Sequence, residues 1–281
     1  MGMVKQLSSD LRDWIITTLN SGVSPVMIAD ALVKKGFDPR FAYESLFQIV
    51  GNEAIRTSER GETPYQYESI EIAKKGNTIC TSDREIKVLS RIEKPFILHL
   101  DNVISPEECA ELIDLSKDRL QPSRVVDSNT GEERTATGRT SKGMYFSINE
   151  NELITKLEKR FSELTQFPVE NGEGLQVLNY QVGDEYKAHF DYFPPHRIQD
   201  DKGGQRVGTL LIYLNDVEAG GETVFPKVGA AIVPKKGSAV YFHYTNRFGQ
   251  VDRMSVHSSI PVAKGEKWVA TKWIRQNAIY S

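Results

Sequence analysis

Cysteine is scarce in this chain, and its two cysteines are not placed for a disulfide framework. Cys80 and Cys109 stand in different sequence contexts, and no Cys-x-x-Cys spacing is present. Small secreted domains that depend on disulfides carry several cysteines at short spacings, and structural zinc sites use paired ones. The sequence therefore predicts a protein of a reducing, cytoplasmic compartment.

An excess of charge of either sign is also missing. The chain has 35 Lys and Arg against 38 Asp and Glu, which gives a net charge of −3 and a pI of about 6.0. This balance gives no electrostatic reason to expect a nucleic acid or an anionic membrane as a partner. No apolar run approaches the roughly 20 residues of a membrane span, and none follows residues 1–6 as in a secretory signal. We expect no nucleic-acid and no membrane partner.

The length and composition are those of a globular protein. The chain has 281 residues, of which 39% are hydrophobic and 26% are charged. A chain of this size can bury a large core, as one domain or as one domain with a small appendage.

Residues 1–55 carry the pattern of three short helices. Apolar residues recur at helical spacing, and Ser24-Pro25 and Asp38-Pro39 each supply an N-cap residue followed by proline at the first helical position. The pattern is loosely similar to ubiquitin-associated-type bundles, which would make it a docking module for a protein partner. We favour a plain packing appendage, because such a pattern specifies only a core. Residues 56–90 are polar and lose this periodicity, so they predict a linker.

Residues 91–281 predict a second domain that is mainly β with flanking helices. Ser105 and Glu108 form a capping-box pattern that opens one helix, and residues 152–164 predict another. Short apolar runs separated by turn residues then follow one another, which is typical of a double-sheet jelly roll. The predicted strands are 175–180, 188–192, 206–214, 229–233, 238–243 and 267–275.

A His-x-Asp pair lies in the second of these strands. Residues i and i+2 of a strand point to the same face, so His189 and Asp191 can reach one metal ion. A second histidine would complete the two-histidine, one-carboxylate set of non-haem Fe(II) oxygenases. The other histidines are His99, His196, His243 and His257, and we take His257 as the partner. A lone His-x-Asp also occurs by chance in many proteins.

The wider sequence resembles the prolyl 4-hydroxylase branch of the Fe(II)- and 2-oxoglutarate-dependent dioxygenases. The resemblance covers about residues 94–278 and implies a double-stranded β-helix, in agreement with the strand pattern. The stretches that carry it are Arg139-Thr140-Ser141, residues 180–191, Gly220-Gly221-Glu222-Thr223, His257, Gly265-Glu266-Lys267-Trp268 and Lys272-Trp273-Ile274-Arg275.

This resemblance assigns roles to individual residues. His189, Asp191 and His257 match the iron ligands, and Lys267 matches the lysine that binds the distal carboxylate of 2-oxoglutarate. Three further residues are matched to the cosubstrate pocket: the hydroxyls of Tyr180 and Thr223 and the aromatic wall Trp273. Without the resemblance, Tyr180 and Trp273 would be interpreted as core aromatics.

Contacts to the substrate are matched to three other residues. Arg206 and Tyr186 correspond to an arginine and a tyrosine that face the peptide, and Arg275 stands where some relatives have a histidine. The polar stretches 122–138 and 192–205 correspond to lids that close over the substrate.

The reaction that the resemblance implies is hydroxylation at C4 of a prolyl residue in a peptide or protein. The reaction would use Fe(II) as its metal cofactor, consume 2-oxoglutarate and O2, and release succinate and CO2. Ascorbate is the expected reductant. The resemblance allows a monomer or a homodimer.

Other functions stay open from the sequence. A dioxygenase of the same chemistry could act on a free amino acid or another small molecule, which would need a closed pocket instead of a channel. A catalytically silent binding protein would not need the intact set of His189, Asp191, His257 and Lys267. A zinc hydrolase could use the same three ligands but would leave Lys267 unexplained.

Overall fold

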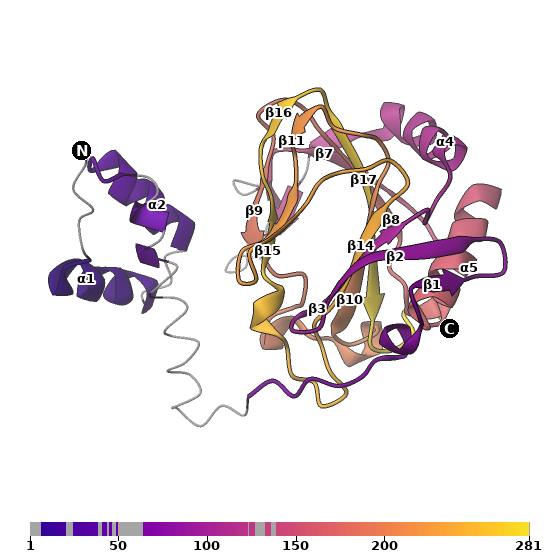
Figure 1. Ribbon diagram of the computed structural model, residues 1–281, viewed down its shortest axis with the longest axis horizontal. Helices are drawn as coiled ribbons and strands as arrows, with labels where there is room; N and C mark the ends of the chain where they lie inside the picture. The colour runs from indigo at the N-terminus through magenta and orange to yellow at the C-terminus, as the bar shows by residue number, and fades with distance from the viewer. Residues whose placement is uncertain are drawn as a thin grey trace. The chain divides into compact units, whose positions relative to one another are not determined.

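The computed structural model (Figure 1) describes residues 7–20, 25–38, 41–43, 45–46, 49, 64–122, 124–126, 133–135 and 139–280. The chain divides into two compact units, Met1–Pro64 and Tyr65–Ser281. None of the helices in the described ranges has the length and hydropathy that crossing a bilayer requires.

The first unit contains the predicted helices. Helix α1 spans Ser9–Asn20 and α2 spans Pro25–Lys34. Of the third predicted helix, residues 41–43, 45–46 and 49 are described and all are helical, and the Phe41 amide donates to the Asp38 side chain as an N-cap does. The core of the unit is made by Ile15, Ile28, Ala29, Leu32, Ala42, Leu46 and Ile49.

The second unit is built from two β-sheets, which confirms the predicted jelly roll. The large sheet has the strand order β1-β2-β3-β14-β10-β17-β8-β7-β4, and the small one has the order β13-β12-β15-β9. The large sheet comprises β1 (Thr78–Cys80), β2 (Glu85–Ile92), β3 (Phe96–Asp101), β4 (Gln121–Pro122), β7 (Lys142–Phe146), β8 (Leu175–Tyr180), β10 (Arg206–Tyr213), β14 (Ala239–His243) and β17 (Lys267–Arg275). The small sheet comprises β9 (Tyr186–His189), β12 (Thr223–Phe225), β13 (Ala230–Ile232) and β15 (His257–Ser259).

Two short strand pairs and several helical turns complete this unit. The pairs are β5 (Arg124–Val126) with β6 (Glu133–Thr135), and β11 (Ala219–Gly220) with β16 (Val262–Lys264). The 3-10 turns are η1 (Glu71–Lys74), η2 (Lys117–Arg119), η3 (Val169–Asn171), η4 (Pro195–Arg197), η5 (Asp200–Lys202) and η6 (Arg253–Ser255).

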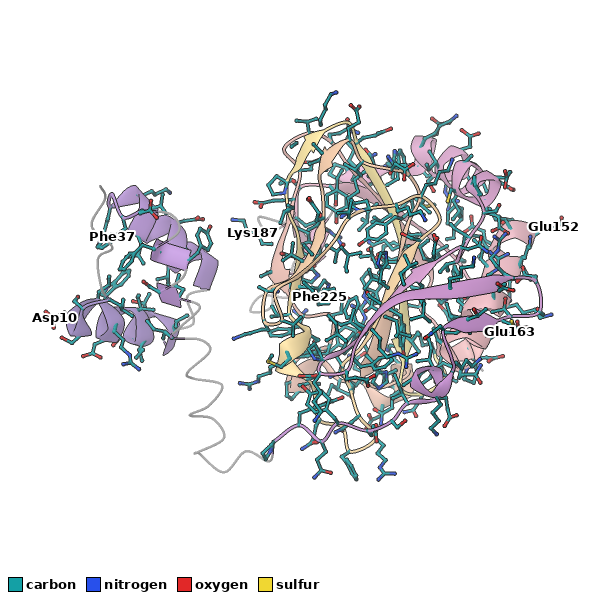
Figure 2. The ribbon with its side chains drawn as sticks, in the orientation of Figure 1. Asp10, Phe37, Glu152, Glu163, Lys187 and Phe225 are labelled. Carbon is teal, nitrogen blue, oxygen red and sulfur yellow. The ribbon has the colours of Figure 1, made fainter. Side chains whose placement is uncertain are left out.

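The last strand, β17, is the centre of the large sheet. It lies between β10 and β8, and each of its nine residues is buried. Its alternate side chains serve two layers: Trp268, Ala270 and Ile274 join the core beneath the helices, whereas Val269 joins the core between the sheets. Phe225 of the small sheet faces this second core from the opposite side (Figure 2).

Helices α4 (Pro106–Ser116) and α5 (Glu152–Thr165) lie on the outer side of the large sheet (Figure 1). The capping box of α4 is as predicted, since the Ser105 hydroxyl accepts from the Glu108 amide and the Glu108 carboxylate accepts from the Ser105 amide. Asn151 caps α5 by accepting from the Ile154 amide.

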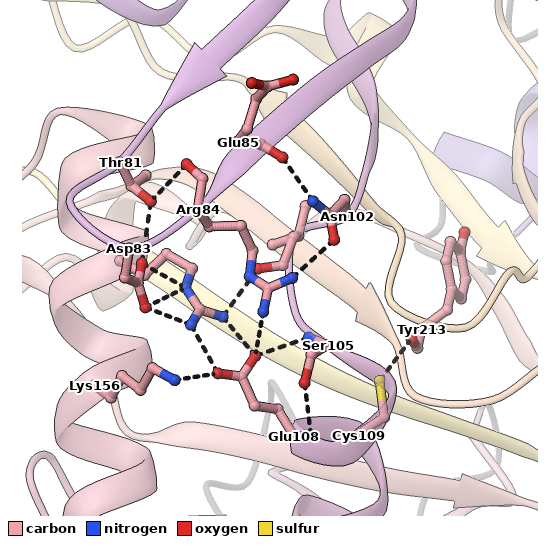
Figure 3. A network of polar contacts seen from close by, with 12 residues as sticks. Thr81, Asp83, Arg84, Glu85, Asn102, Ser105, Glu108, Cys109, Lys156 and Tyr213 are labelled. Carbon is pink, nitrogen blue, oxygen red and sulfur yellow. Dashed lines mark hydrogen bonds and ion pairs between the residues drawn. The ribbon is translucent and has the colours of Figure 1, made fainter.

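A buried guanidinium joins these helices to the first hairpin of the unit (Figure 3). Arg160 of α5 is 1% exposed, and all five of its N–H groups are bonded. Its nitrogens donate to Asp83 at 2.6–3.2 Å, to Glu108 at 2.7 Å, and to the Val103 carbonyl at 3.1 Å. The network fastens the β1–β2 turn to both helices.

The predicted linker is shorter in the structure than in the sequence analysis. Residues 56–63 lie outside the described ones, but residues 65–90 contain η1, β1 and most of β2, which belong to the second unit. β1 is the edge strand of the large sheet and β2 is its neighbour, and most of their residues are exposed or half-buried, so their sequence is polar and shows little periodicity. Ile79 and Ile86 supply their inward anchors.

Candidate metal centre and cavity

Three predicted ligands come together between the two sheets. His189 of β9 and His257 of β15 lie directly opposite each other in the antiparallel pair, and Asp191 follows two residues after His189. The candidate ligand atoms of the three side chains all lie within 4.8 Å of one another. The Asp191 carboxylate is 3.4 Å from His189 Nε2 and 3.6 Å from His257 Nε2. Among the described residues no other His, Cys, Asp or Glu group forms such a cluster.

Hydrogen bonds fix the orientation of each ligand. His189 Nδ1 is 2.8 Å from the Lys187 carbonyl, and His257 Nδ1 is 3.1 Å from the Ser255 carbonyl. A carbonyl only accepts, so both Nδ1 atoms carry the proton and both Nε2 atoms keep a lone pair for a metal. The Thr209 hydroxyl donates to Asp191 Oδ2 at 2.7 Å.

The protonation states also suit a cation. Burial lowers the pKa of His257 to about 4, so the imidazole is neutral at pH 7. Burial alone would raise the pKa of Asp191, but the facing His257 and His189 bring it below its ordinary range, so the carboxylate is ionised. Two neutral imidazoles and one carboxylate, on one side of a cavity, are the donor set that fits Fe(II) with positions left open.

A cavity opens beside this cluster. All seven residues predicted for the metal and the cosubstrate line it: His189, Asp191, His257, Lys267, Tyr180, Thr223 and Trp273. Lys267 and Tyr180 are direct partners in the β17–β8 pair, and Thr223 is paired with Ser259 across β12 and β15. The pocket is therefore walled by both sheets.

Lys267 is a buried cation with no carboxylate in contact among the described residues. It is 1% exposed, and its ammonium donates to the Gly221 carbonyl at 2.6 Å and to the Ser259 hydroxyl at 2.9 Å. Burial lowers its pKa to about 7, against the opposing influence of Glu222. An anion that enters the cavity would stabilise the charged form, and a dicarboxylate can do so while its other end reaches the metal cluster.

The glycines of the Gly220-Gly221 turn are needed for this arrangement. Both have positive φ, at +75° and +73°, and a Cβ on Gly220 would meet the Pro261 carbonyl at 2.3 Å. Only glycine adopts this backbone without strain, and the turn is what aims the Gly221 carbonyl at Lys267.

The predicted substrate residues divide into two groups. Tyr186 lines the cavity and stacks on His189 with ring centroids 3.5 Å apart. Arg206 lies over Trp273 at 4.0 Å and donates to the Asp191 carbonyl at 3.2 Å, while its remaining nitrogens are taken by Glu173 at 2.7 Å. Neither Arg206 nor Arg275 lines the cavity. Arg275 also bonds Glu173 and the Lys202 carbonyl.

One of the predicted lid segments is firmly anchored. The Gln205 side chain bonds both the amide and the carbonyl of Phe193, and the Phe193 ring lies between the guanidinium groups of Arg206 and Arg275 at 4.7 and 4.6 Å. Of the other segment, 122–138, the structure describes Pro122 and the strands β5 and β6, which pair as a hairpin.

Sequence reasoning missed several residues of this site. Arg139 lines the cavity, is 8% exposed, and has no partner for its Nε atom in the described part of the chain. Glu173 orders Arg206 and Arg275, and Thr209 orders Asp191. Arg139 stood in a stretch that carried the resemblance, but Glu173 and Thr209 had no local signal because their partners are distant in sequence.

Comparison with known proteins agrees with this geometry. Residues 175–275 match the family model described as the 2OG-Fe(II) oxygenase superfamily. Prolyl 4-hydroxylase 5 of Arabidopsis thaliana is 40% identical over 210 residues, which cover 68% of this chain and 71% of the relative.

The chain belongs to the prolyl 4-hydroxylase family.

Further similar proteins come from an animal and from a virus. Prolyl 4-hydroxylase subunit alpha-1 of Rattus norvegicus is 39% identical over 187 residues, covering 66% of this chain and 35% of that one. The crystal structure of a viral collagen prolyl hydroxylase from Paramecium Bursaria Chlorella virus-1, a 2OG complex, is 29% identical with a TM-score of 0.51, covering 64% of this chain and 95% of that one. This prolyl 4-hydroxylase homologue is accordingly a 2-oxoglutarate-dependent dioxygenase.

The residues of this family member divide the work of such a reaction. When bound, iron, 2-oxoglutarate and O2 supply the oxidising chemistry. His189, Asp191 and His257 would hold the metal and leave the cavity side open to it. Lys267 would bind and orient the far carboxylate of the cosubstrate, with Tyr180 and Thr223 beside it. Trp273 and Tyr186 keep solvent away from the reacting end.

Replacing Lys267 by alanine should weaken 2-oxoglutarate binding by about 2 kcal/mol or more, roughly 30-fold, because a buried anion loses its counter-charge. The affinity of the unaltered protein should also fall as the pH rises above 7, since the lysine pKa of about 7 leaves it neutral there before the ligand binds. The Lys267→Ala variant should lose that pH dependence. Anaerobic calorimetry between pH 6.5 and 8.5 measures both effects.

Lys264→Ala is the matched control, because Lys264 ends the preceding strand, β16, but is 72% exposed and pairs with Glu218. Equal affinities for the Lys267→Ala variant and the unaltered protein would show that the far carboxylate binds elsewhere.

Proposed function

We propose that this enzyme hydroxylates prolyl residues at C4 within a peptide or protein substrate, with ascorbate as the reductant that keeps the iron ferrous. The observation that carries the proposal is that one cavity is lined by a buried ammonium, by the metal cluster and by aromatic side chains. Tyr186 lines it, and Tyr145, which is paired with Gln176 of the cavity across β7 and β8, is 53% exposed.

Aromatic surfaces of this kind suit a proline-containing chain. Proline-rich peptides adopt an extended, preformed helix whose rings pack against aromatic side chains, so little ordering entropy is lost on binding. A free amino acid would leave these rings in water.

The test is succinate release from 2-oxoglutarate with Fe(II) and ascorbate under air, with proline-rich peptides or with free proline. We expect turnover that depends on peptide, and a mass gain of one oxygen located on proline. Turnover with free proline alone would replace the proposal by the small-molecule reaction. Omission of ascorbate should shorten the active period if it is the reductant.

We also propose a cytoplasmic location and propose that a homodimer, if the enzyme forms one, is not needed for the site. Both described cysteines are free thiols, Cys80 exposed and Cys109 buried, which suits a reducing compartment. The metal cluster and the cavity lining come from one chain. Cell fractionation and light scattering test the two points.

A further inference from the structure

A short segment at the start of the second unit is fastened to the loop that precedes His257. We call residues 65–68 the entry strap and residues 244–256 the ligand loop. The Gln66 amide donates to Gln250 Oε1 at 3.0 Å, and Asn246 Nδ2 donates to the Gln66 carbonyl at 3.0 Å. The Arg247 amide donates to Glu68 Oε1 at 2.8 Å. The entry strap therefore bonds the ligand loop along its length.

Asp252 is the organising residue inside the ligand loop. It is 2% exposed, and its amide donates to the Tyr244 carbonyl at 2.7 Å. Its Oδ1 atom accepts from the Met254 amide at 2.9 Å. Its carbonyl accepts from both the amide and the hydroxyl of Ser255, at 3.1 and 2.7 Å. These bonds define the turn η6 and thereby the direction of the Ser255 carbonyl.

That carbonyl is the group that orients a metal ligand. Ser255 O accepts from His257 Nδ1 at 3.1 Å, and this bond holds the ring so that Nε2 faces the cavity. The other end of the loop reaches a second ligand, because the Tyr244 hydroxyl is 3.0 Å from Thr209 Oγ1, which bonds Asp191. A shift of the ligand loop would therefore change the positions of two of the three ligands, His257 and Asp191.

One oxygen of Asp252 is buried close to both tyrosines of the entry strap, Tyr65 and Tyr67. Oδ2 is buried and accepts no hydrogen bond of good geometry from the described residues. Of these two tyrosines, Tyr67 is the one whose hydroxyl is within reach of this carboxylate as a hydrogen-bond donor. A buried carboxylate oxygen without a donor is destabilising by about 1–3 kcal/mol, so the Tyr67 hydroxyl has a physical role here.

We infer that Tyr67 and Asp252 are positioning residues for the metal centre: the entry strap sets the ligand loop, and the loop sets His257 through the Ser255 carbonyl. This rests on the iron centre of the proposed function but not on the identity of its substrate. Neither residue lines the cavity, so both act through another group.

The experiment uses the full chain and titrates Mn(II), as a redox-stable substitute for Fe(II), by electron paramagnetic resonance with 2-oxoglutarate present and without peptide. Asp252→Ala should raise the Mn(II) Kd about 10- to 100-fold, the loss found for groups that orient metal ligands. Asp252→Asn keeps an acceptor for the Met254 amide and should recover part of the affinity. Tyr67→Phe should give a smaller rise, with its ring contact to Lys94 kept.

The combination of Tyr67→Phe with Asp252→Ala decides whether the two act in series. If the hydroxyl acts only through the carboxylate, the double variant binds Mn(II) as Asp252→Ala does. Tyr280→Phe, which removes the hydroxyl of a tyrosine that is 49% exposed, is the matched control and should leave the Kd unchanged.

The outcomes separate positioning from general stability. A higher Kd for folded Asp252→Asn and Tyr67→Phe, at unchanged melting temperature, supports the inference. Variants that melt earlier but bind Mn(II) as tightly as the unaltered protein would overturn it and leave Asp252 as a structural residue only. Tight Mn(II) binding without peptide turnover would count against the proposed peptide substrate but not against the positioning role of Tyr67 and Asp252.

Discussion

Replacing Asp191 by alanine should abolish metal binding at ordinary concentrations and lower turnover more than 100-fold. Removing a group that only orients a metal ligand lowers metal affinity or activity about 10- to 100-fold, so removing a ligand itself should lower them further. Asp191 is the only anionic member of the cluster, and it lies between the two imidazoles. Without it, two neutral nitrogens would have to hold a dication with no charge to balance it.

Mn(II) titration and succinate release measure the two effects separately. Asp200→Ala is the matched control, because Asp200 lies on the surface of the neighbouring lid segment in η5. Turnover of the Asp191→Ala variant within about tenfold of the unaltered protein would exclude the cluster as the catalytic metal site, because that loss is smaller than for an orienting group.

Replacing Arg160 by methionine should destabilise the second unit by about 3–5 kcal/mol, the range for breaking one member of a buried ionic network. Asp83 and Glu108 would lose the guanidinium they share (Figure 3), and for the buried Glu108 only Lys156 and Arg84 of the described residues would remain as cationic partners. Burial alone would raise the pKa of Glu108, but the bonds from Arg160, Ser105 and Lys156 lower it to about 2.

The sign of the pH dependence follows from that pKa. A carboxyl whose pKa falls on folding stabilises the fold above its unfolded pKa of about 4.5, and this stabilisation is lost as the pH drops toward 2. The difference between Arg160→Met and the unaltered protein should therefore be largest near pH 7 and shrink below about pH 4. Urea unfolding followed by fluorescence at both pH values measures it.

Lys159→Met is the control for this prediction, since Lys159 is the preceding residue of α5 but is 68% exposed. Because Arg160 lies on the helix side of the large sheet, Mn(II) affinity of the folded variant should not change. Equal stability of Arg160→Met and Lys159→Met would show that the network is solvated in solution.

The parts of the site that could be predicted from the sequence are those with a local pattern. Strand periodicity alone predicts that His189 and Asp191 point to the same side, although β9 ends at His189, and the distant His257 and Lys267 were assigned by resemblance. The structure brings all four to one cavity. Arg139, Glu173 and Thr209 could not be predicted from periodicity, because their roles come from strand register and from residues far away in sequence.

Two further features of the structure were also not evident from local sequence patterns. The β1 and β2 strands lie at a sheet edge, where polar residues are tolerated, so their sequence was interpreted as a linker. Arg206 and Arg275 were matched to substrate contacts, but in the structure their guanidinium groups share Glu173. Whether a peptide also reaches them remains a prediction of the resemblance.

The central place of β17 has a consequence for biosynthesis. The strand made last among those of the large sheet fills the gap between β10 and β8 and carries Lys267. Until the residues up to Arg275 have left the ribosome, a nascent chain lacks this middle strand, and β10 and β8 present unpaired edges. Folding of the second unit must therefore wait until nearly all of it has been translated, and iron loading must follow that step.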